Sequence, residues 1–159
     1  MARPRRLEDE PLLSALSART PSENLPLFLD LARHHAALRS PRELLEQRAR
    51  DPFVFPSVVD LRTALRFDQA ALDVASDFEA VLLSPLAPLG VCAAVSPTTQ
   101  DRAVTTVRGT EVVSDPTNAL ALECVRRLKS RDHVRLCTVH QVVRPQKFEK
   151  HPGFSQHFR

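Results

Sequence analysis

The residues best suited to chemistry form a basic segment that follows a β-branched stretch late in the chain. Residues 134–143 have the composition of a strand, and Arg144 comes directly after them. Lys147, Lys150 and His151 follow in a polar loop that leads to a second extended segment near Phe154. An arginine fork binds two phosphate oxygens at once, and nearby cations neutralise further charge. The pattern predicts a polyphosphate site; the alternative is an exposed hairpin whose charges only keep it soluble.

The charge distribution points to an anionic partner for the same part of the chain. The net charge is only +3, but residues 124–159 hold nine Lys and Arg against Asp132 and Glu149. Within this stretch lies the cluster Arg126, Arg127, Lys129 and Arg131, which either complements a helix dipole or contacts nucleic-acid phosphates. The chain has no Tyr or Trp, so the aromatic stacking that single-strand binding uses would be largely missing.

Composition excludes several classes of protein. The 159 residues are 43% hydrophobic and 26% charged, which is typical of a globular protein rather than a disordered one. The sequence has no apolar run long enough to span a bilayer and no apolar core of a secretory signal, so a cytoplasmic protein without a membrane partner is expected. With only three glycines, it has neither a P-loop nor a Rossmann fingerprint.

The remaining candidates for site chemistry are better explained by packing. The three cysteines have no metal-ligand spacing, and Cys124 and Cys137 are expected to be buried as small apolar side chains. His34 and His35 are adjacent, so on a helix they diverge and do not form a metal site. No metal site is therefore predicted from protein ligands.

The first third of the chain predicts short helices separated by prolines. The patterns around Thr20-Pro21 and Ser40-Pro41 are capping boxes with proline in the first helical turn. Residues 51–56 contain two prolines and are predicted to be a linker. Residues 1–56 are therefore expected to be a helical extension and linker.

The rest of the chain predicts an α+β arrangement. Apolar residues at helical spacing predict a long helix over residues 58–83. Extended segments are expected at 91–95 and 102–108, and a central strand at 134–143. Between them, Asp115-Pro116 predicts the start of a helix that runs to Leu128.

The order of these parts resembles the catalytic core of class II aminoacyl-tRNA synthetases, in particular the phenylalanyl and pyrrolysyl branch. The resemblance rests on residues 106–116, then the helix to Leu128, then Val139-His-Gln-Val-Val-Arg144-Pro-Gln146 and His151-Pro-Gly-Phe154-Ser-Gln156. It covers residues 57–159. It implies an antiparallel sheet with flanking helices, preceded by the N-terminal helical segment, and a homodimer formed by the long helix and the strand after it.

The resemblance also implies a nucleotide site that uses ATP and Mg²⁺. Arg144 would be the catalytic arginine that holds the α-phosphate while a carboxylate attacks it. Lys147 and His151 would belong to the loop that covers the nucleotide, and Phe154 would line the adenine pocket. Positioning and charge neutralisation account for most of the catalysis in such a step.

On the substrate side, the resemblance implies an amino acid, with tRNA or another nucleic acid as a further partner. Thr110 and Glu111 would belong to the loop that receives the substrate amine, and Gln156 would line the amino-acid pocket. The sequence does not identify the amino acid.

Two departures keep other functions open. The family's Arg-x-Glu is Arg144-Pro145-Gln146 here, so the acidic group is missing. The glycine-rich motif 3 is absent. The alternation of apolar and polar residues before Arg159 predicts the beginning of a strand, so the natural protein is expected to continue beyond this residue. The chain is therefore predicted to be an ATP-binding synthetase-like protein or fragment that activates a carboxylate if completed. The alternatives are a non-catalytic paralogue acting as a regulatory or binding module, and a small basic nucleic-acid-binding domain.

Overall fold

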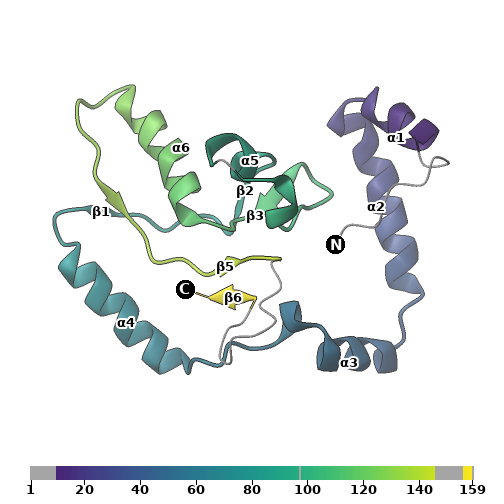
Figure 1. Ribbon diagram of the computed structural model, residues 1–159, viewed down its shortest axis with the longest axis horizontal. Helices are drawn as coiled ribbons and strands as arrows, with labels where there is room; N and C mark the ends of the chain where they lie inside the picture. Colours follow the sequence, from purple (N-terminus) through teal and green to yellow (C-terminus); the bar gives the residue numbers. More distant parts are fainter. Residues whose placement is uncertain (1–9, 97, 146–155, 159) are drawn as a thin grey trace. The chain divides into compact units, whose positions relative to one another are not determined.

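The computed structural model describes residues 10–96, 98–145 and 156–158, and these form a mixed α+β structure (Figure 1). By contacts, the chain divides into two compact units, Met1–Pro41 and Arg42–Arg159. The segment 51–56, expected to be a linker, therefore belongs by contacts to the second unit. The assignment of residues 57–159 to a separate synthetase-like core stays a prediction.

The first unit contains α1 (Glu10–Ser17) and α2 (Pro21–Ala37). The predicted capping box at the start of α2 is confirmed. The backbone N–H of Glu23 donates to Thr20 Oγ1 over 3.3 Å, and the Glu23 carboxylate accepts from the Thr20 backbone N–H over 2.7 Å. The buried Asn24 joins the two helices, because its Nδ2 donates to the Leu16 carbonyl over 2.7 Å.

The second unit begins with α3 (Pro41–Arg50), a single 3-10 turn η2 (Pro52–Val54) and α4 (Leu61–Val74). The prediction of one helix over 58–83 was too long at both ends. Asp60 caps α4 by accepting from the Thr63 backbone N–H over 3.0 Å, and the chain leaves the helix after Val74. It does so because the following residues extend to pair with a distant strand, a contact that the apolar spacing does not encode.

The strands form three separate two-stranded sheets within the described residues. The pairs are β1 (Glu79–Ala80) parallel to β4 (Leu136–Cys137), β2 (Leu86–Pro88) antiparallel to β3 (Thr110–Val112), and β5 (Val142–Val143) antiparallel to β6 (His157–Phe158). The single central strand predicted over 134–143 is therefore wrong. Its two ends pair with different partners, which interrupts the strand although its β-branched composition continues.

The extended segment predicted at 91–95 is also wrong, and the one predicted at 102–108 is confirmed only in part. Residues 91–95 form the short helix α5 (Val91–Val95), which begins after Gly90 at φ 95°, in the left-handed region that favours glycine. Around the second segment the chain forms a 3-10 turn, η3 (Gln100–Arg102), and one isolated bridge from Thr105 to Glu111.

The helix predicted from Asp115-Pro116 is confirmed as α6 (Pro116–Leu128). Asp115 caps it, since its Oδ1 accepts from the Thr117 backbone N–H over 2.9 Å. The small core lies beside the start of this helix and contains Ala87, Val91, Val113 and Val142, with Ala119 packed against them. It therefore joins β2, α5, the end of β3, β5 and α6.

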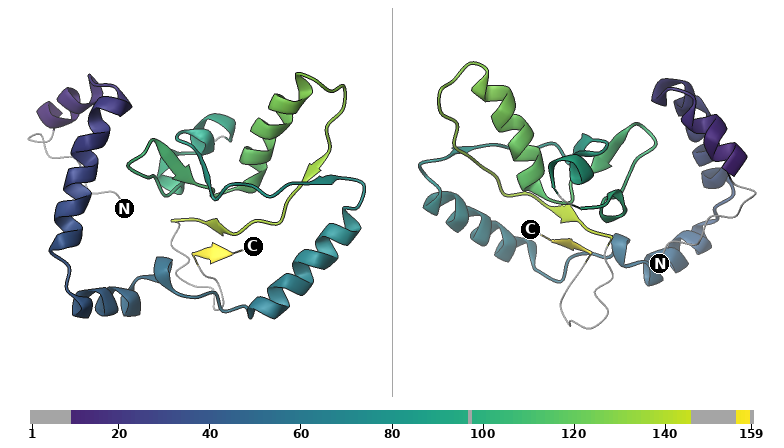
Figure 2. Two further views of the ribbon diagram at one scale, coloured as in Figure 1. Left: turned by 180° about the vertical axis from the view of Figure 1, so that it is seen from behind. Right: turned by 45° about the horizontal axis from the view of Figure 1, so that its top comes forward.

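The helix α4 makes only sparse contacts with the other described elements. In Figures 1 and 2, β5 and β6 lie between α4 and α6. None of the residues of α4 is buried, and Leu61 and Leu65 on its apolar side are 66% and 53% exposed. Among the helices in the described part of the chain, none has both the length and the apolarity needed to cross a bilayer.

Candidate functional site

The β5–β6 pair places Arg144 beside the first turn of α6. Val142 is buried in the core, and the Val143 backbone N–H donates to the Val113 carbonyl over 3.3 Å. The Arg144 Nε then donates to the Ser114 carbonyl over 2.9 Å, and one terminal nitrogen lies 3.7 Å from Asp115 Oδ2. With 35% of its side chain exposed, Arg144 is held in place and is still accessible to a ligand.

Gln156, expected in the amino-acid pocket, lies next to Arg144 along the hairpin. Its carbonyl accepts the Arg144 backbone N–H over 2.9 Å. The residue is only 8% exposed, and its side-chain Oε1 is buried without a hydrogen-bond partner in the described structure. The structure thus brings two predicted site residues together and leaves the Gln156 Oε1 as a buried acceptor without a partner among the described residues.

Glu111, expected to meet a substrate amine, is engaged within the protein. It is 2% exposed and lies on β3. One carboxylate oxygen accepts the Cys92 backbone N–H over 2.8 Å, and the other accepts from the Gly90 backbone over 2.9 Å and from Gln100 Nε2 over 2.7 Å. These bonds hold the start of α5 against β3, so Glu111 acts first as a structural acceptor.

Thr110, which was predicted to lie with Glu111 in the loop that receives the substrate amine, stabilises a neighbouring turn. Its hydroxyl lies 2.7 Å from the Thr106 hydroxyl, and its carbonyl accepts the Thr106 backbone N–H over 2.8 Å. Gly109, at φ 68°, allows the tight reversal between them. Thr110 is not one of the residues that line the pocket beside Glu111.

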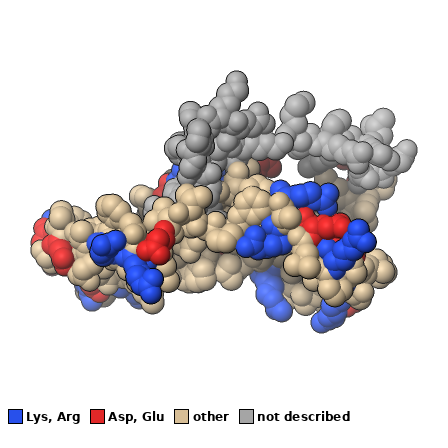
Figure 3. Space-filling model, turned by 90° about the horizontal axis from the view of Figure 1, so that it is seen from below, with Lys and Arg blue, Asp and Glu red and all other residues tan. Residues whose placement is uncertain are grey.

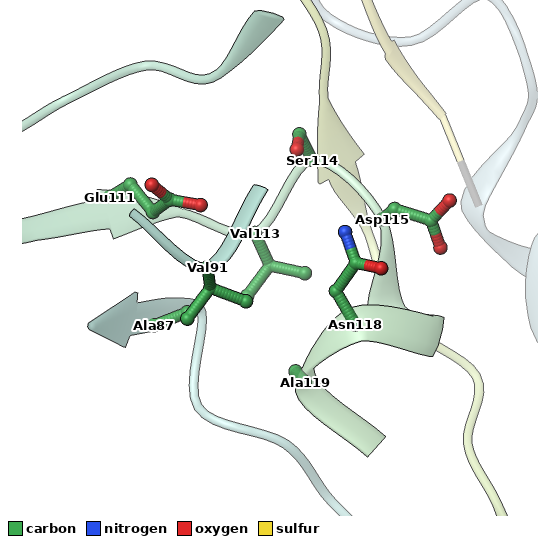
Figure 4. Close-up of a pocket in the computed structure, with 8 residues that line it drawn as sticks. All are labelled: Ala87, Val91, Glu111, Val113, Ser114, Asp115, Asn118 and Ala119. Carbon is green, nitrogen blue, oxygen red and sulfur yellow. The ribbon is translucent and has the colours of Figure 1, made fainter. Parts of the chain in front are cut away.

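A small pocket opens between β2, α5, the end of β3 and the first turn of α6 (Figure 4). Its apolar side consists of Ala87, Val91, Val113 and Ala119. Its polar side consists of Glu111, Ser114, Asp115 and Asn118. The space between these side chains is about 180 Å³ with open solvent included, and none of it is wide enough to admit a water molecule.

Asn118 is the pocket residue that sequence reasoning missed. The predicted apolar stripe of this helix contains Leu120, Cys124 and Leu128, yet Leu128 is 49% exposed while Asn118 is only 8% exposed. Its amide points toward Ser114 and Asp115 (Figure 4). Its burial could have been expected from its position in the sequence. Asn118 comes three residues after the capping Asp115, where a side chain lies close to the preceding strand.

The other residues expected at the nucleotide site, Lys147, His151 and Phe154, lie outside the described residues. Gln146, which occupies the place of the family's acidic residue, lies outside them too. Their assignment stays a prediction from the sequence.

The basic cluster at the C-terminal end of α6 is paired with acidic side chains. Glu123 accepts from Arg126 over 2.7 and 2.8 Å and from Arg127 over 2.6 Å. Glu79 on β1 accepts from Arg127 and, over 2.9 Å, from Arg131. These hydrogen bonds, from Arg126 first and then Arg127, lower the pKa of Glu123 to about 2. Those from Arg127 and Arg131 lower the pKa of Glu79 as well.

A neighbouring arginine is paired in the same way. Arg135 lies 2.5 Å from Asp77 Oδ2, and its guanidinium stacks 4.5 Å from the centre of the Phe78 ring. Figure 3 shows basic and acidic side chains next to one another on the face that it displays. Much of the positive charge that the sequence concentrates here is therefore balanced locally.

The minor candidates add no site. His34 and His35 stack edge to face with their ring centres 5.9 Å apart. Within the described ranges, no three His, Cys, Asp or Glu side chains form a group suited to a metal ion. Cys124 and Cys137 are half-buried.

Comparison of the chain with models of protein families, with curated protein sequences and with solved structures yields no match.

Proposed function

We propose that the chain binds ATP through a class II synthetase-like core and that Arg144 contacts the α-phosphate. The observation that carries this proposal is the placement of Arg144 at the end of β5. Its Nε is held by the Ser114 carbonyl, while a third of the side chain stays exposed. An arginine anchored through one nitrogen has a guanidinium fork of defined orientation, which suits phosphate recognition.

In the proposed reaction, a carboxylate oxygen attacks the α-phosphorus and the bond from that phosphorus to pyrophosphate breaks. Arg144 would neutralise charge on the phosphoryl oxygens as it builds up. Asp115, 3.7 Å from the guanidinium, orients it in the absence of nucleotide. Mg²⁺ would arrive with the nucleotide, since it often binds mainly through phosphates and water, and no protein ligand is assigned to it from the described residues.

The test is ligand-induced thermal stabilisation. Mg·ATP at about one hundred times its Kd should stabilise the chain by about 2.7 kcal/mol, and the melting temperature of a protein this size rises about 2–4 °C per kcal/mol. Arg144→Ala should abolish the shift, and Arg144→Lys should retain only part of it because lysine lacks the fork. The shift, rather than the melting temperature itself, is compared because Arg144 also contacts the fold.

Arg126→Ala is the matched control for this test. Arg126 is exposed, is paired with Glu123, and lies at the opposite end of α6. Its loss should leave the Mg·ATP shift unchanged. Equal stabilisation of wild type and Arg144→Ala would refute the assignment of Arg144.

The non-catalytic alternative is favoured by Gln146 in place of an acidic residue. It predicts that Mg·ATP binds but that no amino acid supports pyrophosphate exchange. The nucleic-acid alternative predicts an affinity that falls steeply with salt. The ion pairs of Arg126, Arg127, Arg131 and Arg135 argue against it, since these arginines already have acidic partners.

The proposed homodimer would use α4 and the strand after it. Support comes from Leu61, Leu65 and Phe67, which are 53–70% exposed on a helix that packs little against its own chain. Sedimentation of the wild type should give twice the monomer mass, and Leu65→Glu should return it to the monomer.

A further inference from the structure

We draw no further inference here: the strongest candidate, the buried Gln156 Oε1 that has no hydrogen-bond partner among the described residues and lies beside Arg144 in the β5–β6 hairpin, belongs to the site already described.

Discussion

The two ends of α6 differ in how their polar groups are used. At the C-terminal end, Arg126 and Arg127 are bound to Glu123 and Glu79, so the charges are exposed but paired. Near the N-terminal end, where Arg144 contacts Ser114, the side-chain amide Oε1 of Gln156 is buried without a hydrogen-bond partner among the described residues. The charge density in the sequence indicates the arginines as candidate site residues, whereas burial in the structure indicates the amide without a partner.

This difference teaches that the number of charges is a weaker guide to a binding site than the number of unsatisfied buried groups. Exposed ion pairs contribute little to stability. A buried polar group without a partner is costly and calls for an explanation. Three predictions sharpen the comparison, in order of decreasing effect.

The largest effect is expected from Glu111→Ala, beside the N-terminal end of α6. It removes the acceptor of three N–H groups, from Gly90, Cys92 and Gln100, and should cost about 3 kcal/mol or more of unfolding free energy. Urea denaturation measures the loss. Glu111→Gln, which keeps one acceptor oxygen, should lose less. The comparison fails if Glu123→Ala, at the other end of α6, loses as much as Glu111→Ala.

An intermediate effect should distinguish the two buried asparagines. Asn24→Ala removes the bond to the Leu16 carbonyl and should cost about 1–2 kcal/mol. Asn118→Ala removes an amide that lacks a partner, and should change stability by no more than about 0.5 kcal/mol, or increase it. Urea unfolding of both variants provides the test, and equal losses would mean that Asn118 has a structural bond.

The smallest effect concerns how the free energy of unfolding depends on pH through Glu123, near the C-terminal end of α6. The pKa of Glu123 is about 2 in the folded chain against an ordinary value of 4.5. Its carboxylate therefore contributes stability that is complete above pH 4.5 and is lost as the pH falls toward 2. Glu123→Gln should reduce the difference in stability between pH 7 and pH 3. An unchanged difference would show that the pair with Arg126 and Arg127 contributes nothing in solution.

Local signals in the sequence predicted two of the helices that begin with a side-chain cap, α2 and α6. Thr20 with Glu23, and Asp115 with Pro116, place hydrogen-bond acceptors where the first N–H groups of α2 and α6 need them. All the groups involved are within three residues of one another, so the sequence contains the whole interaction. The position of Arg144 at the end of a strand followed from the same local reading.

Tertiary contacts decided the elements for which the local reading was wrong. Residues 91–95 read as a strand but form α5, because Glu111, nineteen residues beyond Cys92, accepts the N–H groups at its start. Residues 134–143 were predicted to be one strand but contain two, β4 and β5, which pair with β1 and β6 respectively. In each case the deciding hydrogen bond joins residues far apart in sequence, and spacing along one segment cannot reveal it.

The candidate site shows the same division. The sequence by itself determined that Arg144 follows a strand and that a helix starts at Asp115, because composition and capping are local properties. Only the tertiary structure brought Arg144 to Ser114, used Glu111 to hold α5, paired the arginines of α6 and buried Asn118 beside the core. Burial and pairing depend on which segments meet, and that is a property of the folded chain.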